Sequence, residues 1–239
     1  MLVASAVCPC PPLLVPQVAS GAAPEMDAAR TACYDALALL AASRPDRLVV
    51  VGAAQASSRG VYPQGSTGSF RGFGVDLEVT LGTADGQRDG DAPRLPHSLA
   101  VGAWLLARTG WNAAPVEGLA VEELLDRDRC ASTGRGIAAS ASRVALLALG
   151  DGTACRTLKA PGYFDPRAAA FDADAARALG AADVGALLEL DPDLAHELRA
   201  AGRSVWQVLA GAAEGADLGG RLFYDDAPYG VGYLVAGWS

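Results

Sequence analysis

The sequence predicts an α/β protein of three layers, in which helices flank a central, mostly parallel sheet. Three apolar runs carry this prediction, at residues 2–7, 47–52 and 143–150. Runs that are apolar throughout, rather than alternating, are typical of strands buried on both faces. A helical pattern at residues 24–43 joins the first run to the second, and a strand–helix–strand unit implies parallel strands. We expect a single domain over residues 1–239, because no repeat or linker divides the chain.

The stretch after the second strand is less regular. Residues 53–74 are rich in Gly, Ser and Gln without periodicity, which predicts a long loop. Residues 75–81 alternate polar and apolar side chains, as expected of a half-exposed strand at a sheet edge. A polar turn is predicted over residues 82–91. The next helix, over residues 95–109, begins with Pro96 in its first turn.

Helices dominate the last third of the predicted chain. Asp191 followed by Pro192 is a helix start, because aspartate caps free amides and proline suits the first helical position. The remaining expected elements are a strand at 115–119, a helical stretch from 121, helices at 192–202 and 205–213, and two short apolar runs within 221–238.

The charge and apolar content of the chain argue against nucleic-acid and membrane partners. The chain has 239 residues and a formal net charge of −8, so it lacks the clustered cations that a nucleic-acid surface needs. After the proline-rich start, no uncharged run approaches the ~18 residues of a membrane helix, and no basic segment marks an export signal. Five cysteines without framework spacing favour free thiols in a reducing compartment. We therefore expect a cytoplasmic protein with no membrane partner.

Two cysteines mark the first candidate site. Cys8 and Cys10 follow the first strand, among prolines that force the chain out of the sheet in a stiff, extended loop. Open α/β sheets bind ligands at this end of their strands. On an extended chain both thiols point to one side, within reach of a single soft metal ion. The alternative is that both are small buried hydrophobic residues.

A second candidate follows the third buried strand, in the sequence Gly-Asp-Gly-Thr. Its backbone amides could hold an anion, or Asp151 could hold a cation, with Thr153 beside it. The alternative interpretation is a tight turn that needs two glycines. Asp225 and Asp226 raise a similar choice between a cation site and a solvated turn.

The two histidines offer little chemistry by themselves. His196 lies on an amphipathic helix between charged residues, and we interpret it as a surface residue. His97 lies in the first turn of a predicted helix, where a neutral imidazole can act as a cap. No phosphate-binding glycine motif and no G-x-S-x-G nucleophile motif is present, which disfavours nucleotide binding and a serine triad.

Several segments together resemble one family. They are C-P-C-P-P-L-L-V-P at 8–16, R-L-V-V-V-G at 47–52, G-D-G-T-A at 150–154, K-A-P-G-Y-F-D-P-R at 159–167 and Y-D-D-A-P-Y-G-V-G-Y at 224–233. This set resembles a bacterial branch of the LigB-like proteins. These are relatives of the catalytic subunit of class III extradiol ring-cleaving dioxygenases and, more distantly, of the Memo proteins. The resemblance implies an α/β fold with a mostly parallel sheet, and in the enzymes a ferrous ion held by two histidines and a carboxylate.

The family's metal ligands are replaced in this chain. The first metal histidine corresponds to Cys10, and the second falls in a segment whose one polar side chain is Gln55. The carboxylate ligand lies a helical turn before a tryptophan that matches Trp206, where Gly202 and Arg203 stand.

The acid–base histidine of the dioxygenases is also replaced. It follows the strand that matches residues 144–149, and Thr153 and Cys155 stand at its place. A ferrous ion on Cys10 and Gln55 alone would be weakly held, and no residue remains at these positions to deprotonate a catechol. Extradiol cleavage by the family mechanism is therefore not expected.

The sequence thus predicts a LigB-like protein that has lost its metal and acid–base residues and acts as a small-molecule binding or regulatory protein. The alternative is a metal-dependent oxidoreductase in which Cys8 and Cys10 hold iron or another transition metal. No catalytic residue is identified, and the expected pocket lies at the carboxyl ends of the strands. Its expected lining is Cys8, Cys10, Gln55, Asp151 and Thr153.

Overall fold

The computed structural model describes residues 1–83 and 94–239, and it confirms the α/β class. In these residues the main sheet contains seven strands: β1 (Leu2–Cys8), β2 (Arg47–Ala54), β3 (Gly60–Tyr62), β6 (Val116–Glu122), β7 (Val144–Leu149), β8 (Gly220–Asp226) and β9 (Tyr233–Trp238). Their order across the sheet is β3-β6-β2-β7-β1-β9-β8. The four strands from β6 to β1 run parallel, whereas β3, β9 and β8 join antiparallel.

Strand β7 lies between β1 and β2 and pairs with both. Cys8 of β1 and Gly52 of β2 are each opposite Leu149 of β7. The carboxyl ends of these three strands therefore meet at one edge of the sheet, where the chain continues into the predicted site segments. We call this place the carboxyl edge.

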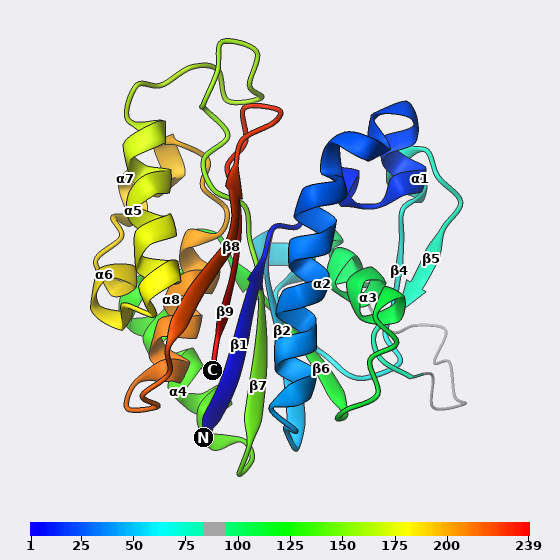
Figure 1. Cartoon of the computed structure of the whole chain (residues 1–239), viewed down its shortest axis with the longest axis vertical. Coiled ribbons are helices and arrows are strands. Elements are labelled where there is room, and N and C mark those ends of the chain that lie inside the picture. Colours follow the sequence, from blue (N-terminus) through cyan, green and yellow to red (C-terminus); the bar gives the residue numbers. More distant parts are fainter. Residues whose placement is uncertain (84–93) are drawn as a thin grey trace.

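Helices cover both faces of the sheet (Figure 1). One face carries α2 (Asp27–Ala42), α3 (His97–Arg108) and the short α1 (Pro16–Ala19), and the other carries α4 (Arg127–Ala139), α5 (Ala168–Ala181), α6 (Val184–Leu188), α7 (Pro192–Glu197) and α8 (Arg203–Ala213). Short 3₁₀ turns lie at η1 (Pro12–Leu14), η2 (Ser20–Met26), η3 (Ala56–Ser58) and η4 (Arg71–Phe73).

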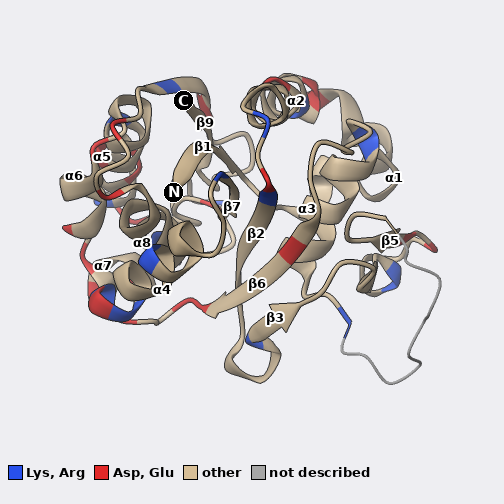
Figure 2. Cartoon of the chain, turned by 90° about the horizontal axis from the view of Figure 1, so that it is seen from below, with Lys and Arg blue, Asp and Glu red and all other residues tan. Residues whose placement is uncertain are grey.

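Alternation along the strands builds one hydrophobic core on each face. In β1, Ala4, Ala6 and Cys8 join the core beneath α2 and α3, whereas Val7 joins the core beneath α5 and α8. Every residue of β7 and β9 is buried, as expected of strands covered on both faces. Charged segments of both signs lie on the helices and loops, and the central strands are almost free of charge (Figure 2).

Apolar length also bears on membrane insertion. Among the described helices, none combines the length and the hydropathy that crossing a bilayer requires.

The region after β2 departs from the prediction. The expected loop over 53–74 contains β3, which forms the edge of the main sheet, and β4 (Thr67–Ser69). The strand expected over 75–81 is shortened to β5 (Glu78–Thr80), and it pairs with β4 in a separate two-stranded sheet. Strands of three residues are too short to show a period of two, so the sequence carries no signal for them. The polar turn predicted over 82–91 lies outside the described residues from 84 onward.

Other differences lie at element ends. The proline segment after Cys10 is not fully extended, because Pro12 and Pro16 each begin a short helical turn. The helix capped by Asp191 stops at Glu197 instead of reaching Gly202. Strand β6 continues to Glu122, where a helix was expected to begin.

Helices α4 and α8 approach each other closely. A Cβ atom built on Gly134 of α4 would lie 2.0 Å from the carbonyl oxygen of Val208. On the other helix, a Cβ atom on Gly211 would lie 2.3 Å from the carbonyl oxygen of Ala131. The two helices are therefore in direct backbone contact, which any side chain at either glycine would block.

Candidate functional site

The carboxyl edge brings together residues that follow different strands. Cys10 follows β1, Gln55 follows β2 and Asp151 follows β7. The backbone N–H of Cys10 donates a hydrogen bond of 2.7 Å to Oδ1 of Asp151, which ties the end of β1 to the end of β7. Two of the predicted site residues, 141 positions apart in sequence, are thus in direct contact.

Asp151 is the central titratable group of this edge. Its side chain is half-buried, and desolvation raises its pKa from 3.8 to about 7, while the Cys10 N–H opposes part of this rise. A carboxyl with this pKa exchanges a proton near neutral pH and keeps some contact with solvent. Such a combination is common at binding and catalytic sites.

A thiol and a phenol lie near the Asp151 carboxyl, and both stay protonated at neutral pH. Burial raises the pKa of Cys10, and the charges of Asp151 and Glu123 raise it further. Burial likewise raises the pKa of Tyr233 at the start of β9, with Asp151 as the largest charge contribution. Both groups therefore act as hydrogen-bonding groups without charge.

His97 and Glu123 complete the edge, and the sequence did not single out Glu123 at all. Glu123 comes directly after β6, in a segment that was expected to be helical. His97 is the first residue of α3; the cap position is Pro96, and no side chain caps this helix. Although part of His97 is exposed, desolvation lowers the pKa of its imidazole, and Glu123 acts in the opposite direction. The imidazole of His97 is thus neutral at pH 7 and interacts with the charge of Glu123. It does not cap the helix.

Cys8 lies in the hydrophobic core, away from the residues of the carboxyl edge described above. It is fully buried in the core beneath α2, where its thiol adjoins that of Cys33. Burial raises the pKa of Cys8 first, and a hydrogen bond with the Cys33 thiol raises it further. Among the predicted pocket residues, Cys8 is therefore placed in the hydrophobic core, together with a third cysteine that sequence spacing could not connect to it.

Thr153 and Gln55 also take different places. Gln55 is exposed just past β2. Thr153 is fully buried, and its backbone N–H and its hydroxyl both donate to the carboxylate of Asp172. The structure thus shows Thr153 as part of a loop anchor.

Asp172 of α5 organises the loop after β7. Its carboxylate is 1% exposed and accepts from the Thr153 N–H at 2.8 Å, from the Thr153 hydroxyl at 2.9 Å and from Nη1 of Arg156 at 2.9 Å. Gly152 and Gly232 pack so closely on it that a Cβ atom on Gly232 would lie 2.4 Å from its Oδ2. We call Asp172, Thr153 and Arg156 the Asp172 anchor. It explains the Gly-Asp-Gly-Thr sequence by packing and hydrogen bonding around a carboxylate.

The remaining polar candidates lie at the surface. Asp225 and Asp226 are exposed on β8, and Asp226 accepts a hydrogen bond from the backbone N–H of Ala227. His196 is exposed on α7, in agreement with its interpretation as a surface residue.

Arg203 is a buried cation at the start of α8. Its guanidinium is 1% exposed and donates to the backbone carbonyls of Glu123 and Leu125 and to the side chain of Gln207. Burial lowers its pKa. The position thus carries a cation that fixes the segment after β6, and with it the backbone of Glu123.

These donors do not fit a transition-metal ion. Within residues 1–83 and 94–239, no three His, Cys, Asp or Glu side chains are close enough to share one. The thiol of Cys10 has a raised pKa, which disfavours the thiolate that binds metal, and a buried guanidinium at 203 repels a cation.

Comparison with known proteins identifies a structure with a similar fold. No protein-family model and no curated protein sequence matches the chain. Among solved structures, the chain is similar to an uncharacterised protein, JW3007, from Escherichia coli K12. The TM-score is 0.61 at 15% sequence identity, over 99% of each chain. Similarity at this identity shows a shared fold.

The raised pKa of Asp151 predicts a pH-dependent stability. The folded state holds this proton more tightly than the unfolded chain does, so ionisation destabilises the fold. Its stabilising contribution is complete below about pH 4 and is lost as the pH rises through about 7. Asp151→Asn keeps the acceptor for Cys10 but cannot ionise. We expect the stability advantage of the variant over the native protein to grow by about 2–3 kcal/mol between pH 5 and pH 9.

Urea unfolding at pH 5 and pH 9 measures this difference. Asp174→Asn on α5 is the matched control, because Asp174 is exposed and, within residues 1–83 and 94–239, pairs with Arg177 alone. A stability difference between Asp151→Asn and the native protein that is the same at both pH values would contradict the prediction.

Proposed function

We propose that this protein binds an uncharged phenolic small molecule, such as a catechol, at the carboxyl edge, and that it does not cleave the ring. The half-buried Asp151 carboxyl, with its pKa near 7, is the observation that carries the proposal. It is supported by the resemblance of the sequence to LigB-like proteins, whose metal and acid–base positions are replaced here.

The charges at the edge favour this class of ligand. Asp151 and Glu123 contribute negative charge above neutral pH, while His97 has a lowered pKa and stays neutral. An anion would be repelled there, whereas a phenol can donate its hydroxyl proton to the Asp151 carboxylate in a charge-assisted hydrogen bond. The thiol of Cys10 and the phenol of Tyr233 adjoin this carboxyl as neutral hydrogen-bonding groups.

Ring cleavage requires more than a base. Asp151 could accept a proton from a phenol, since its pKa is near neutrality. Extradiol chemistry also needs a metal that binds the substrate and dioxygen together. The donor set described above does not supply such a site among the described residues.

Calorimetry with catechol under anaerobic conditions tests the proposal. The carboxylate form accepts the phenolic hydrogen bond, so we expect catechol to bind about threefold to tenfold more tightly at pH 8 than at pH 6. Asp151→Asn should remove this pH dependence and weaken binding at pH 8 about tenfold. Asp174→Asn, an exposed carboxylate on α5, should leave both values unchanged.

Three results would overturn the proposal. Catechol that does not bind at millimolar concentration, or that binds equally well to Asp151→Asn at both pH values, would remove Asp151 from the site. Oxygen uptake that exceeds the protein-free rate after ferrous iron and catechol are added would show that ring cleavage survives.

The alternative function, a metal-dependent oxidoreductase, predicts that the purified protein contains a metal ion. In it, Cys8 and Cys10 hold a soft metal, although burial raises the pKa of both thiols. Metal analysis of protein purified without chelator decides between the two functions. Stoichiometric metal that disappears in a Cys8→Ala/Cys10→Ala double variant would favour the alternative.

A further inference from the structure

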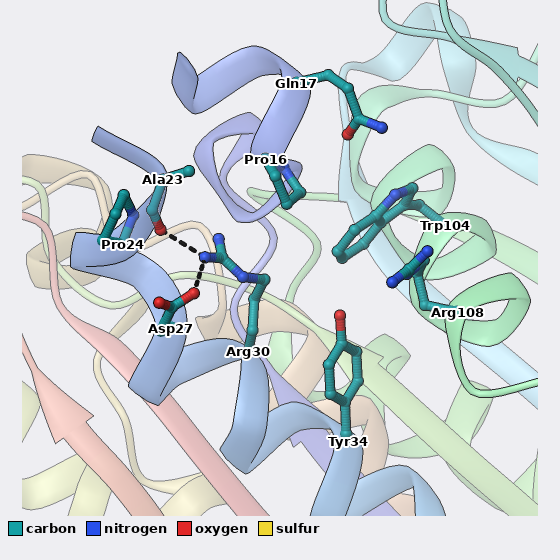
Figure 3. A pocket seen from close by; sticks show the side chains of 9 residues that line it. All are labelled: Pro16, Gln17, Ala23, Pro24, Asp27, Arg30, Tyr34, Trp104 and Arg108. Carbon is teal, nitrogen blue, oxygen red and sulfur yellow. Dashed lines mark hydrogen bonds and ion pairs between the residues drawn. The ribbon is translucent and has the colours of Figure 1, made fainter. Parts of the chain in front are cut away.

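A cavity of about 430 Å³ lies on the α2–α3 face of the protein, apart from the carboxyl edge (Figure 3). It is open to solvent and is lined by α1, η2, α2 and α3. Its lining residues are Pro16, Gln17, Ala23, Pro24, Asp27, Arg30, Tyr34, Trp104 and Arg108. None of them belongs to the carboxyl-edge group, so the two sites can be altered independently. A volume of this size is typical of small-molecule sites.

One wall of the cavity is built around a fixed arginine. Arg30 is 6% exposed, and its guanidinium donates to the backbone carbonyls of Leu14 and Ala23 and pairs with Asp27. Figure 3 shows this group directed toward Asp27 and Ala23. The charge of Arg30 is therefore compensated by Asp27, and its role is to hold the wall in place.

The opposite wall carries a cation that has no partner among the residues that the structure describes. Arg108 ends α3 and is exposed, and among the described residues it forms neither an ion pair nor a hydrogen bond. Trp104, four residues earlier, lies on the same face of the helix and is 5% exposed. In Figure 3, the Trp104 ring and the Arg108 guanidinium face the space into which the Tyr34 hydroxyl points.

We propose that this cavity binds a flat aromatic carboxylate. The three charged groups in the lining sum to one positive charge, which matches a single carboxylate and not a polyphosphate. Arg108 can bind a carboxylate with two parallel hydrogen bonds, and the Tyr34 hydroxyl can add a third. The small exposed part of the Trp104 indole offers an apolar contact to the ring of the ligand.

Titration with 2-naphthoate, followed by calorimetry, tests this site. We expect 2-naphthoate to bind the native protein and the neutral isostere 2-naphthamide to bind about tenfold more weakly, because only the carboxylate forms charged hydrogen bonds with Arg108. Arg108→Gln should weaken 2-naphthoate binding about tenfold and leave 2-naphthamide binding nearly unchanged.

Two controls locate the effect. Arg177→Gln removes an exposed arginine from α5, on the other face of the sheet, and should leave the affinity for 2-naphthoate unchanged. Asp151→Asn alters the carboxyl edge alone and should also leave it unchanged. Filling the cavity with Gln17→Trp, at an exposed position, should abolish binding of both probes.

The proposal is overturned by any of three results. These are equal affinity for the acid and the amide, an unchanged affinity in Arg108→Gln, or a loss in Asp151→Asn as large as that in Arg108→Gln. The last result would assign the ligand to the carboxyl edge.

Discussion

Gly134→Ala is expected to destabilise the protein by at least about 4 kcal/mol or to prevent folding. The new Cβ atom would lie 2.0 Å from the carbonyl oxygen of Val208 and 2.5 Å from the amide nitrogen of Ala212. Both are backbone atoms inside α8, so a side-chain rotation cannot relieve the overlap. The two helices would have to separate, and the close packing between them would be lost along their length.

The same helix supplies the control. Gly136 lies two residues further along α4 and is exposed, and no atom lies within 4 Å of the place that a Cβ atom would take there. Gly136→Ala should therefore stabilise the protein by about 0.5–1 kcal/mol through helix propensity alone. Chemical unfolding of the two variants measures the difference. Equal stability of Gly134→Ala and Gly136→Ala would show that the helices are not in backbone contact.

Asp172→Ala is expected to cost about 3–5 kcal/mol, the second largest effect. The change leaves the Thr153 N–H, the Thr153 hydroxyl and the Arg156 guanidinium without their acceptor, in a region from which water is largely excluded. Since the anchored loop begins at Asp151, the loss should also disturb the carboxyl edge. We therefore expect catechol binding to weaken along with stability.

Unfolding measurements on a small set of variants distinguish the stability contributed by the Asp172 anchor from that of nearby surface residues. Asp174→Ala removes an exposed carboxylate from the same helix and should change stability by less than about 0.5 kcal/mol. Thr153→Val removes one donor, so the cost of Asp172→Ala should be smaller in a Thr153→Val background. Costs that add without coupling would mean that the hydrogen bonds between Thr153 and Asp172 contribute little.

The strands of the sheet were predictable because they are apolar throughout. Three of them, at Leu2–Cys8, Arg47–Ala54 and Val144–Leu149, lie within two residues of their expected bounds. Apolar runs of this length are typical of strands that are buried on both faces. The position of β7 between the first two was not predictable, because strand order depends on contacts between distant segments. The short strand at Gly60–Tyr62 carries no periodic signal, so its sequence resembles that of a loop.

The candidate site was predictable only in part, because it too depends on contacts between distant segments. Asp151 and Cys10 each follow a recognisable strand, and the carboxyl ends of parallel strands share an edge. Glu123 was missed because β6 continues past the point where the sequence begins to look helical. Asp172 was missed because a lone aspartate on an alanine-rich helix looks like a surface residue, and its burial depends on the loop that folds over it.

The position of β1 has a consequence for how the chain reaches this structure. Its two neighbours in the sheet are β7, more than 130 residues later, and β9, more than 220 residues later. β1 is therefore synthesised well before either of its two partners. Such distant pairings raise the contact order, which slows folding and prolongs the time that an apolar strand is exposed.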